Sequence, residues 1–168
     1  PEKPIVFSGY GQGRPVINMG KEEGTAITIL NSDGLEIVGF EITSGFPPEV
    51  GVGRNGILID EREPGRAFSH IVIKDNYIHD IWGQMGGTRL RCAAISGGVM
   101  RPWRGFPLPQ DFSTLEDVLI EGNRIERVDK VGITTTGIDK LRVRRNYMDN
   151  LGGDGIIVSS SFRAVVEF

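Results

Sequence analysis

A strand-like motif that ends in a polar pair and an asparagine recurs along this chain. The copies run over 71–78, 118–125 and 141–148 and carry Asn76, Asn123 and Asn146. Asn123 and Asn146 are 23 residues apart, and an earlier copy over 35–42 has Phe40 where the others have asparagine. A fixed period of about 20–50 residues is typical of solenoids and other repeat arrays, so this repeat constrains the fold more strongly than composition does.

A second strand follows each asparagine at a fixed distance. Gly132 lies nine residues after Asn123, and Gly155 lies nine residues after Asn146. The corresponding strands cover 56–59, 94–97, 132–135 and 155–158. Because a 23-residue period holds three short strands with their turns, we predict an all-β, single-stranded, right-handed parallel β-helix of about four to five coils.

This fold predicts two stacked rows. The asparagines should lie one above another at a corner, hydrogen-bond through their amides, and adopt the left-handed backbone conformation that a sharp corner needs. The inward row should hold Ile57, Ile59, Ile95, Ile133, Ile156 and Val158.

Two other architectures fit the spacing less well. A leucine-rich repeat of similar period needs a leucine framework that is absent here. A β-sandwich needs hairpin turns such as Asn-Gly between adjacent strands, and the one Asn-Gly pair, Asn55-Gly56, precedes a strand already assigned to a coil.

Composition narrows the class of protein. The 168 residues suit one domain, here 1–168, and the 24 glycines suit many turns and short strands. The net charge of -3 gives no basic footprint for nucleic acid, and no apolar run approaches the roughly 20 residues of a membrane span. The single cysteine, Cys92, excludes an intrachain disulfide and is predicted to be a small buried turn residue.

Departures from the 23-residue period locate four insertions that all flank the same strand of the coil. They cover about 43–54, 60–68, 82–92 and 98–114, two before the strand and two after it. A sheet walled on both sides in this way forms a groove. Alternation places these residues outward on its floor: Leu58, Asp60, Ser96, Gly98, Thr134, Thr136, Ile157 and Ser159. Such small, weakly polar side chains suit an elongated, hydroxyl-rich ligand.

The asparagine motifs and Gly-Ile strands resemble the right-handed parallel β-helix family of pectate lyases, polygalacturonases and other polysaccharide lyases and glycoside hydrolases. The resemblance covers roughly 35–168, and the segments 3–10 and 14–17 are similar to the first coil of secreted bacterial members. It implies a polysaccharide or oligosaccharide ligand along the parallel sheet and an extracellular or periplasmic location. We expect a glycoside hydrolase first. Because a fold does not determine the reaction, a non-catalytic carbohydrate-binding or scaffold β-helix and a uronate lyase or epimerase remain alternatives.

Asp154 is the predicted catalytic acid, in a glycine-rich turn at the lip of the floor. The turn resembles the Gly-Asp-Asp turn of polygalacturonase-type hydrolases, with Gly155 in place of the second aspartate. Aspartate is equally a good turn former. Hydrolysis needs a second carboxyl about 5–10 Å away. Asp60, three coils back, would lie roughly 14 Å away, so the partner is expected from a loop or from coils beyond Phe168.

Other candidate ligand contacts come from a corner and from the long insertions. His79 should stack with Glu126 and Asp149, either as a base or within a ladder of polar turns. Arginines and aromatic residues of the insertions could bind a uronate, or could instead cap carbonyls and pack their own loop. The residues are Arg91, Arg101 and Trp103, with Arg89, Arg104, Trp82 and Phe106 nearby. No carboxylate cluster supports a Ca²⁺ site, and neither metal nor cofactor is predicted.

Both ends of the chain lie inside strand patterns. Val143 and Val166 are again 23 residues apart, so a further coil is expected to begin near Phe168. We therefore expect a domain that continues in both directions, with further coils or self-association at the open C-terminal end.

Overall fold

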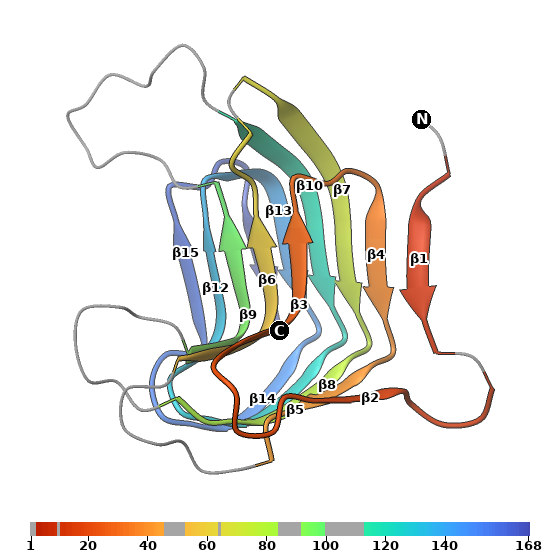
Figure 1. Cartoon of the computed structure of the whole chain (residues 1–168). Coiled ribbons are helices and arrows are strands. Elements are labelled where there is room, and N and C mark those ends of the chain that lie inside the picture. The colour runs from red at the N-terminus through yellow and green to blue at the C-terminus, as the bar shows by residue number, and fades with distance from the viewer. Residues whose placement is uncertain (1–2, 10, 46–52, 64, 84–91, 100–112) are drawn as a thin grey trace.

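The computed structural model describes residues 3–9, 11–45, 53–63, 65–83, 92–99 and 113–168, which form a right-handed parallel β-helix built from three parallel sheets (Figure 1). We call the sheets A, B and C. Sheet A contains β1 (Ile5–Ser8), β4 (Leu35–Val38), β7 (Ala67–Lys74), β10 (Thr114–Glu121), β13 (Ile138–Arg144) and β16 (Val165–Glu167). Sheet B contains β2 (Val16–Asn18), β5 (Glu41–Thr43), β8 (Tyr77–Ile81), β11 (Arg124–Val128) and β14 (Tyr147–Leu151). Sheet C contains β3 (Gly24–Leu30), β6 (Arg54–Asp60), β9 (Cys92–Gly98), β12 (Val131–Thr136) and β15 (Ile156–Ser159).

Each coil takes one strand from each sheet in the order A, B, C. Five coils are therefore present, and β16 begins a sixth, in agreement with the predicted architecture. The predicted 23-residue period is confirmed in the last coils, where Val143 pairs with Val166 and Asn123 bonds to Asn146. The described residues contain no helix, and so no helix that could cross a membrane.

The asparagine ladder lies at the corner between sheets A and B. The Asn76 amide nitrogen donates to Asn123 Oδ1 at 3.0 Å, and the Asn123 amide nitrogen donates to Asn146 Oδ1 at 2.9 Å. Each side chain also donates to a backbone carbonyl of the preceding coil, as Asn123 does to Ile73. Asn76 and Asn123 are 0% and 1% exposed, so the ladder is an internal spine that satisfies the polar groups of the corner.

One detail of this prediction is wrong. The left-handed residue of the corner is the one before each asparagine. The φ values are 54° at Asp75, 64° at Gly122 and 52° at Arg145. The preceding residue makes the turn, and the asparagine directs its amide along the helix axis toward its neighbour.

The core is a set of aliphatic rows that run through the coils. Ile57, Ile95 and Ile133 pair in register in sheet C and are each 0% exposed. Ile59 is 1% exposed, whereas Ile156 and Val158 are only partly buried because they belong to the last complete coil. The inward row is thus confirmed, and each fully buried side chain stabilises the fold by about 1.5–3 kcal/mol.

Candidate functional site

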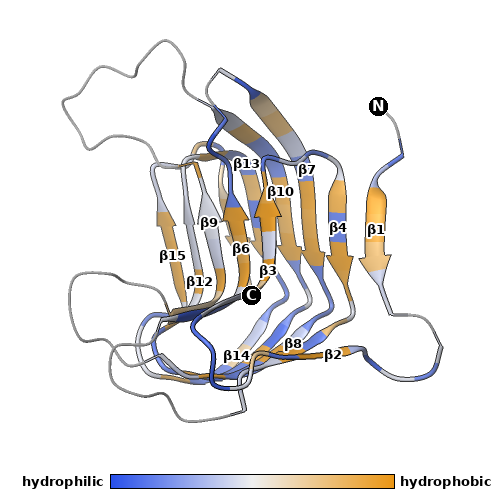
Figure 2. Cartoon of the chain, in the orientation of Figure 1, coloured by the Kyte–Doolittle hydropathy of each residue, from blue (hydrophilic) through white to orange (hydrophobic). Residues whose placement is uncertain are grey.

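The outer face of sheet C, which we call the floor, differs from the other sheet faces in its chemistry. The strand pairings align its outward residues in two rows: Thr28, Leu58, Ser96, Thr134 and Ile157, and then Leu30, Asp60, Gly98, Thr136 and Ser159. Hydroxyl, glycine and aliphatic side chains dominate both rows. Strands β9 and β12 are accordingly pale in Figure 2, in contrast with the apolar β6. The described part of the floor is therefore weakly polar and carries one ionisable side chain, Asp60.

The middle of the floor is flattened by close backbone contact between coils. Gly97 and Gly98 have φ values of 130° and 123°, and a Cβ at either position would collide with the carbonyl oxygen of Ile59 or Thr136. Beside them Ser96 is half-buried, and its buried hydroxyl has no hydrogen-bond partner among the described residues. Thr134 is half-buried in the next strand. The floor thus presents shallow side chains and backbone, with Ser96 recessed and Thr134 more available to a ligand.

The lower lip of the floor is the corner between sheets B and C, and it holds two aspartates. Val128 pairs with Leu151, which places Asp129 beside Gly152. The Gly132 N–H donates to the Asp154 carbonyl at 3.0 Å, which places Asp154 beside Val131. The two aspartates are thus one coil and two residues apart, a Cα separation of about 8 Å from strand rise and coil spacing.

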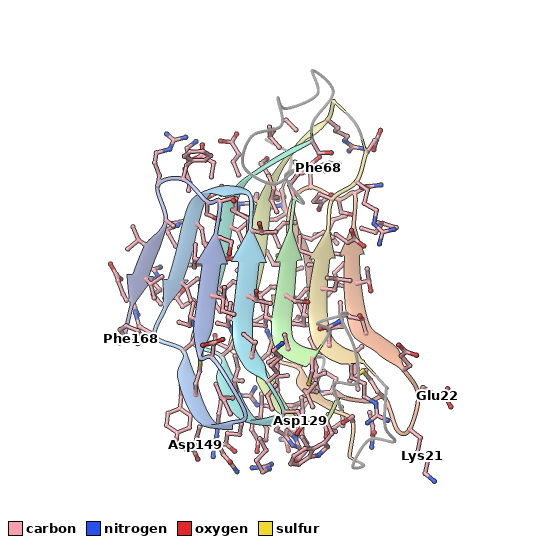
Figure 3. All side chains as sticks on the ribbon, turned by 90° about the vertical axis from the view of Figure 1, so that its left-hand side faces the viewer. Lys21, Glu22, Phe68, Asp129, Asp149 and Phe168 are labelled. Atoms are coloured by element: carbon pink, nitrogen blue, oxygen red, sulfur yellow. The ribbon has the colours of Figure 1, made fainter. Side chains whose placement is uncertain are left out.

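Glycines allow the two coils to meet this closely at the lip. A Cβ at Gly152 would overlap the Asp129 backbone, and one at Gly153 would crowd Lys130. Asp154 is exposed, whereas Asp129 is half-buried and its Oδ2 accepts the Gly83 N–H at 2.9 Å. In Figure 3, Asp129 is labelled at the lower end of the upright strands and Phe68 at the upper end. Glycoside hydrolysis needs two carboxyls about 5–10 Å apart, and the backbone spacing of the two aspartates at this lip is of that order. The Asp129 carboxylate itself is directed toward Gly83 in the preceding coil, on the side away from Asp154.

Comparison of equivalent positions alone missed Asp129. Asp154 aligns with Val131 and Ala93, neither of which is acidic, but the same corner carries an aspartate two residues earlier in the neighbouring coil. A search for acidic residues at any position of the equivalent turn in the neighbouring coil would have identified Asp129.

Asp60 lies at the opposite end of the floor strands from Asp154. It aligns with Gly98, Thr136 and Ser159, and the residue of its own strand that aligns with Asp154 is Asn55. Five residues along the strand and three coils across give about 22 Å, so the sequence-based value of roughly 14 Å was too short. Asp60 is held by an ion pair with Arg62. It is therefore no partner for Asp154.

The residue after Asp60 is an acid that alternation turns inward, and sequence analysis missed it. Glu61 is 4% exposed; its Oε1 accepts the Ser32 N–H at 3.5 Å, and its Oε2 has no hydrogen-bond partner in the part of the chain that the structure describes. Burial, with added repulsion from Asp33 and Asp60, raises the pKa of Glu61 to about 7, although the Ser32 N–H opposes the shift. An acid in the inward register of Ile57 and Ile59 was the available signal.

His79 lies outside the floor, on the outer face of sheet B. Its predicted alignment with Glu126 and Asp149 is confirmed. Its Nδ1 lies 2.6 Å from Asp80 Oδ2 and its Nε2 lies 3.2 Å from Glu41 Oε1. With both ring nitrogens engaged by carboxylates, His79 belongs to a ladder of polar side chains.

The remaining predicted contacts fall into two groups. Arg91, Arg101 and Trp103, with Arg89, Arg104 and Phe106, lie outside the described residues. Cys92 is buried as predicted, at 2% exposed, but it opens strand β9 instead of lying in a turn. Burial raises the pKa of its thiol to about 11, which suits a packing role. Among the described residues, no three His, Cys, Asp or Glu side chains are grouped as metal ligands would be.

Comparisons with known proteins support the fold. No family model and no curated protein sequence matches this chain. A solved structure, the GH136 lacto-N-biosidase from Eubacterium ramulus, is similar with a TM-score of 0.69 and 14% sequence identity. The match covers 98% of this chain and 41% of that enzyme, so this chain spans about two fifths of its length. At this identity the similarity establishes a shared architecture and leaves the reaction to be argued from the site.

Proposed function

We propose that this chain belongs to a carbohydrate-active β-helix protein that binds an extended glycan along the floor and hydrolyses it at the lower lip. The observation that carries the proposal is the floor itself: its described outward residues are hydroxyl, glycine and aliphatic apart from Asp60 at the upper edge, and Asp129 and Asp154 lie at the lower lip. The glycoside hydrolase activity of the structurally similar lacto-N-biosidase supports the same class of ligand.

The chemistry at the lip would use two carboxyls. Asp154, exposed and at the edge of the floor, is placed to protonate the glycosidic oxygen of a bound glycan. Asp129 accepts a backbone N–H, an arrangement that suits an ionised carboxylate acting as base or nucleophile. The sugar rings would lie across Thr134 and its neighbours in the floor.

A non-catalytic glycan-binding protein is the second candidate. It is favoured by the position of the acid pair, which lies at the lip and leaves the described middle of the floor without a carboxyl. A floor of this kind could bind a glycan without cleaving it.

Release of reducing ends from neutral and acidic polysaccharides tests the proposal. We expect the wild-type chain to cleave at least one of them, and Asp154→Asn and Asp129→Asn each to lower the rate at least about 100-fold. Asp149→Asn is the matched control, because Asp149 is an exposed aspartate on sheet B, and it should retain full activity.

Three other outcomes have distinct meanings. Glycan binding without cleavage would establish the non-catalytic alternative. Cleavage that survives both Asp154→Asn and Asp129→Asn would reject this acid pair. Neither binding nor cleavage across the panel would contradict the proposed function.

A further inference from the structure

The upper lip of the floor, where β6 turns into the segment before β7, joins three coils. The side-chain oxygen of Asn31, which follows β3, accepts the N–H groups of Arg62 at 2.8 Å and Glu63 at 3.1 Å. The Ser113 hydroxyl, just before β10, donates to the Glu63 carbonyl at 2.6 Å. We call residues 60–63 with Asn31 and Ser32 the upper corner. Any change in its packing would be transmitted to the end of the floor strands.

Glu61 sits under this corner with half of its carboxyl unsatisfied. The side chain is 4% exposed, and among the described residues it receives one hydrogen bond, a 3.5 Å contact from the Ser32 N–H. A buried carboxylate needs compensating donors, whereas a protonated carboxylic acid is much cheaper to bury. The geometry of the site therefore favours the neutral form.

The charges around Glu61 reinforce this preference. Asp33 from the coil before and Asp60 from its own strand repel an ionised Glu61, and Arg66 attracts it more weakly. Arg62 is paired with Asp60, and Arg66 is shared between Glu63 and Asp33. The coil after presents Gly98 beside Asp60 and then the uncharged Val99. The described groups around Glu61 thus supply more negative than positive charge.

We propose that Glu61 is a pH-sensitive latch of the upper corner. Protonated, it stays packed beneath the Asn31 turn and holds the end of the floor closed. Ionised, it moves toward water, and the hydrogen bonds from Arg62 and Glu63 to Asn31 weaken. The latch goes beyond the proposed function, because it acts on the corner whether or not a glycan binds.

The direction of the effect follows from linkage. A carboxyl whose pKa is higher in the folded corner than in the open one stabilises the closed form fully below its ordinary pKa. That stabilisation is lost as pH rises toward and through about 7, the pKa of Glu61 in the closed corner. The closed form of the upper corner should accordingly be more stable at mildly acidic pH than at mildly basic pH.

Amide hydrogen exchange at the corner, corrected for intrinsic rates, tests the latch. Between about pH 5.5 and about pH 8.5, protection at Arg62 and Glu63 should fall at least about tenfold in the wild-type chain. In Glu61→Gln, which stays neutral, protection should not change with pH. Glu23→Gln, an exposed acid just before β3 and outside the upper corner, should behave as the wild type.

Two results would overturn the inference. One is wild-type protection that does not change across this pH range, and the other is a fall that persists in Glu61→Gln. If Glu61→Gln does not fold, the NMR chemical shift of the Glu61 carboxyl carbon is followed in the wild-type chain as a function of pH. A midpoint near 7 supports the latch, and a midpoint near the ordinary value of 4.5 rejects it.

Discussion

The outer faces of the three sheets are built on the same backbone but carry different chemistry. On sheet A, His70 contacts Glu36 of the coil before and Asp117 of the coil after. On sheet B, Arg127 bonds Asp80 in the preceding coil, and Arg124 lies over the rings of Tyr77 and Tyr147 from neighbouring coils. On the described floor of sheet C, the one ion pair is Asp60 with Arg62, at the edge.

This difference separates two uses of a solenoid surface. Charged and aromatic side chains in register across coils bind each strand to the next, and each such pair adds about 0.2–1 kcal/mol. The floor lacks these ladders, so its stability rests on the inward isoleucines and its outward groups remain available. Because the outward side chains of the floor contribute little to the stability of the coils, they are the ones that are available to bind a ligand.

Two variants of one strand test the contrast between the inward row and the floor most severely, because one places a carboxylate on the inward side and the other places it on the outward side. Ile133→Asp puts a carboxylate into a site that is 0% exposed, and it should destabilise the chain by more than about 4 kcal/mol and unfold the middle coils. Thr134→Asp, the next residue on the floor, should change the free energy of unfolding by less than about 1 kcal/mol. Thermal and urea unfolding of both variants would measure this. A stable Ile133→Asp chain would show that the inward row is assigned wrongly.

The asparagine spine offers the next largest effect. Asn123→Ala removes a side chain that accepts two hydrogen bonds from Asn76, at 3.0 Å each, and donates to Ile73 and Asn146. Because it leaves the buried Asn76 N–H unpaired, we expect a loss of about 2–4 kcal/mol. Thr134→Ala on the floor serves as the control and should cost far less. A loss for Asn123→Ala below about 0.5 kcal/mol would show that the spine adds little to stability.

The stabilisation that the ion pairs of sheet B provide should decrease at low pH. Arg127, assisted by His79, lowers the pKa of Asp80 to about 2. A lowered pKa gives stability that is present above the ordinary value near 3.8 and is lost as pH falls toward 2. Asp80→Asn should therefore be less stable than the wild type by about 1–2 kcal/mol at neutral pH and equal to it near pH 2. Asp154→Asn, at the exposed lip, should leave the free energy of unfolding at neutral pH unchanged. An equal loss in both variants would contradict the contrast between the two faces.

The sequence predicted the repeat-determined parts of this molecule and missed those set by side-chain context. The 23-residue period located the asparagine spine and Ile133, because stacking forces equivalent residues into rows. It did not place the left-handed residue at Asp75, since only the amide geometry of the following asparagine shows which residue turns. Asp129 and Glu61 were missed because each departs from its row, one in a turn and the other at the end of an inward strand. Residues that differ in this way from their repeat row are often functional, and their roles depend on three-dimensional contacts that the repeat does not predict.

Chemical-shift mapping with oligosaccharides tests the central claim, that the floor is the ligand face. Neutral and uronate hexasaccharides would be titrated into the labelled wild-type chain and into Thr134→Asp. The account predicts that the first signals to move are those of Thr134, Asp154 and their floor neighbours, and that Thr134→Asp weakens binding without unfolding the chain. Shifts confined to the charged faces of sheets A and B, around His70 or His79, with undiminished binding to Thr134→Asp, would contradict it.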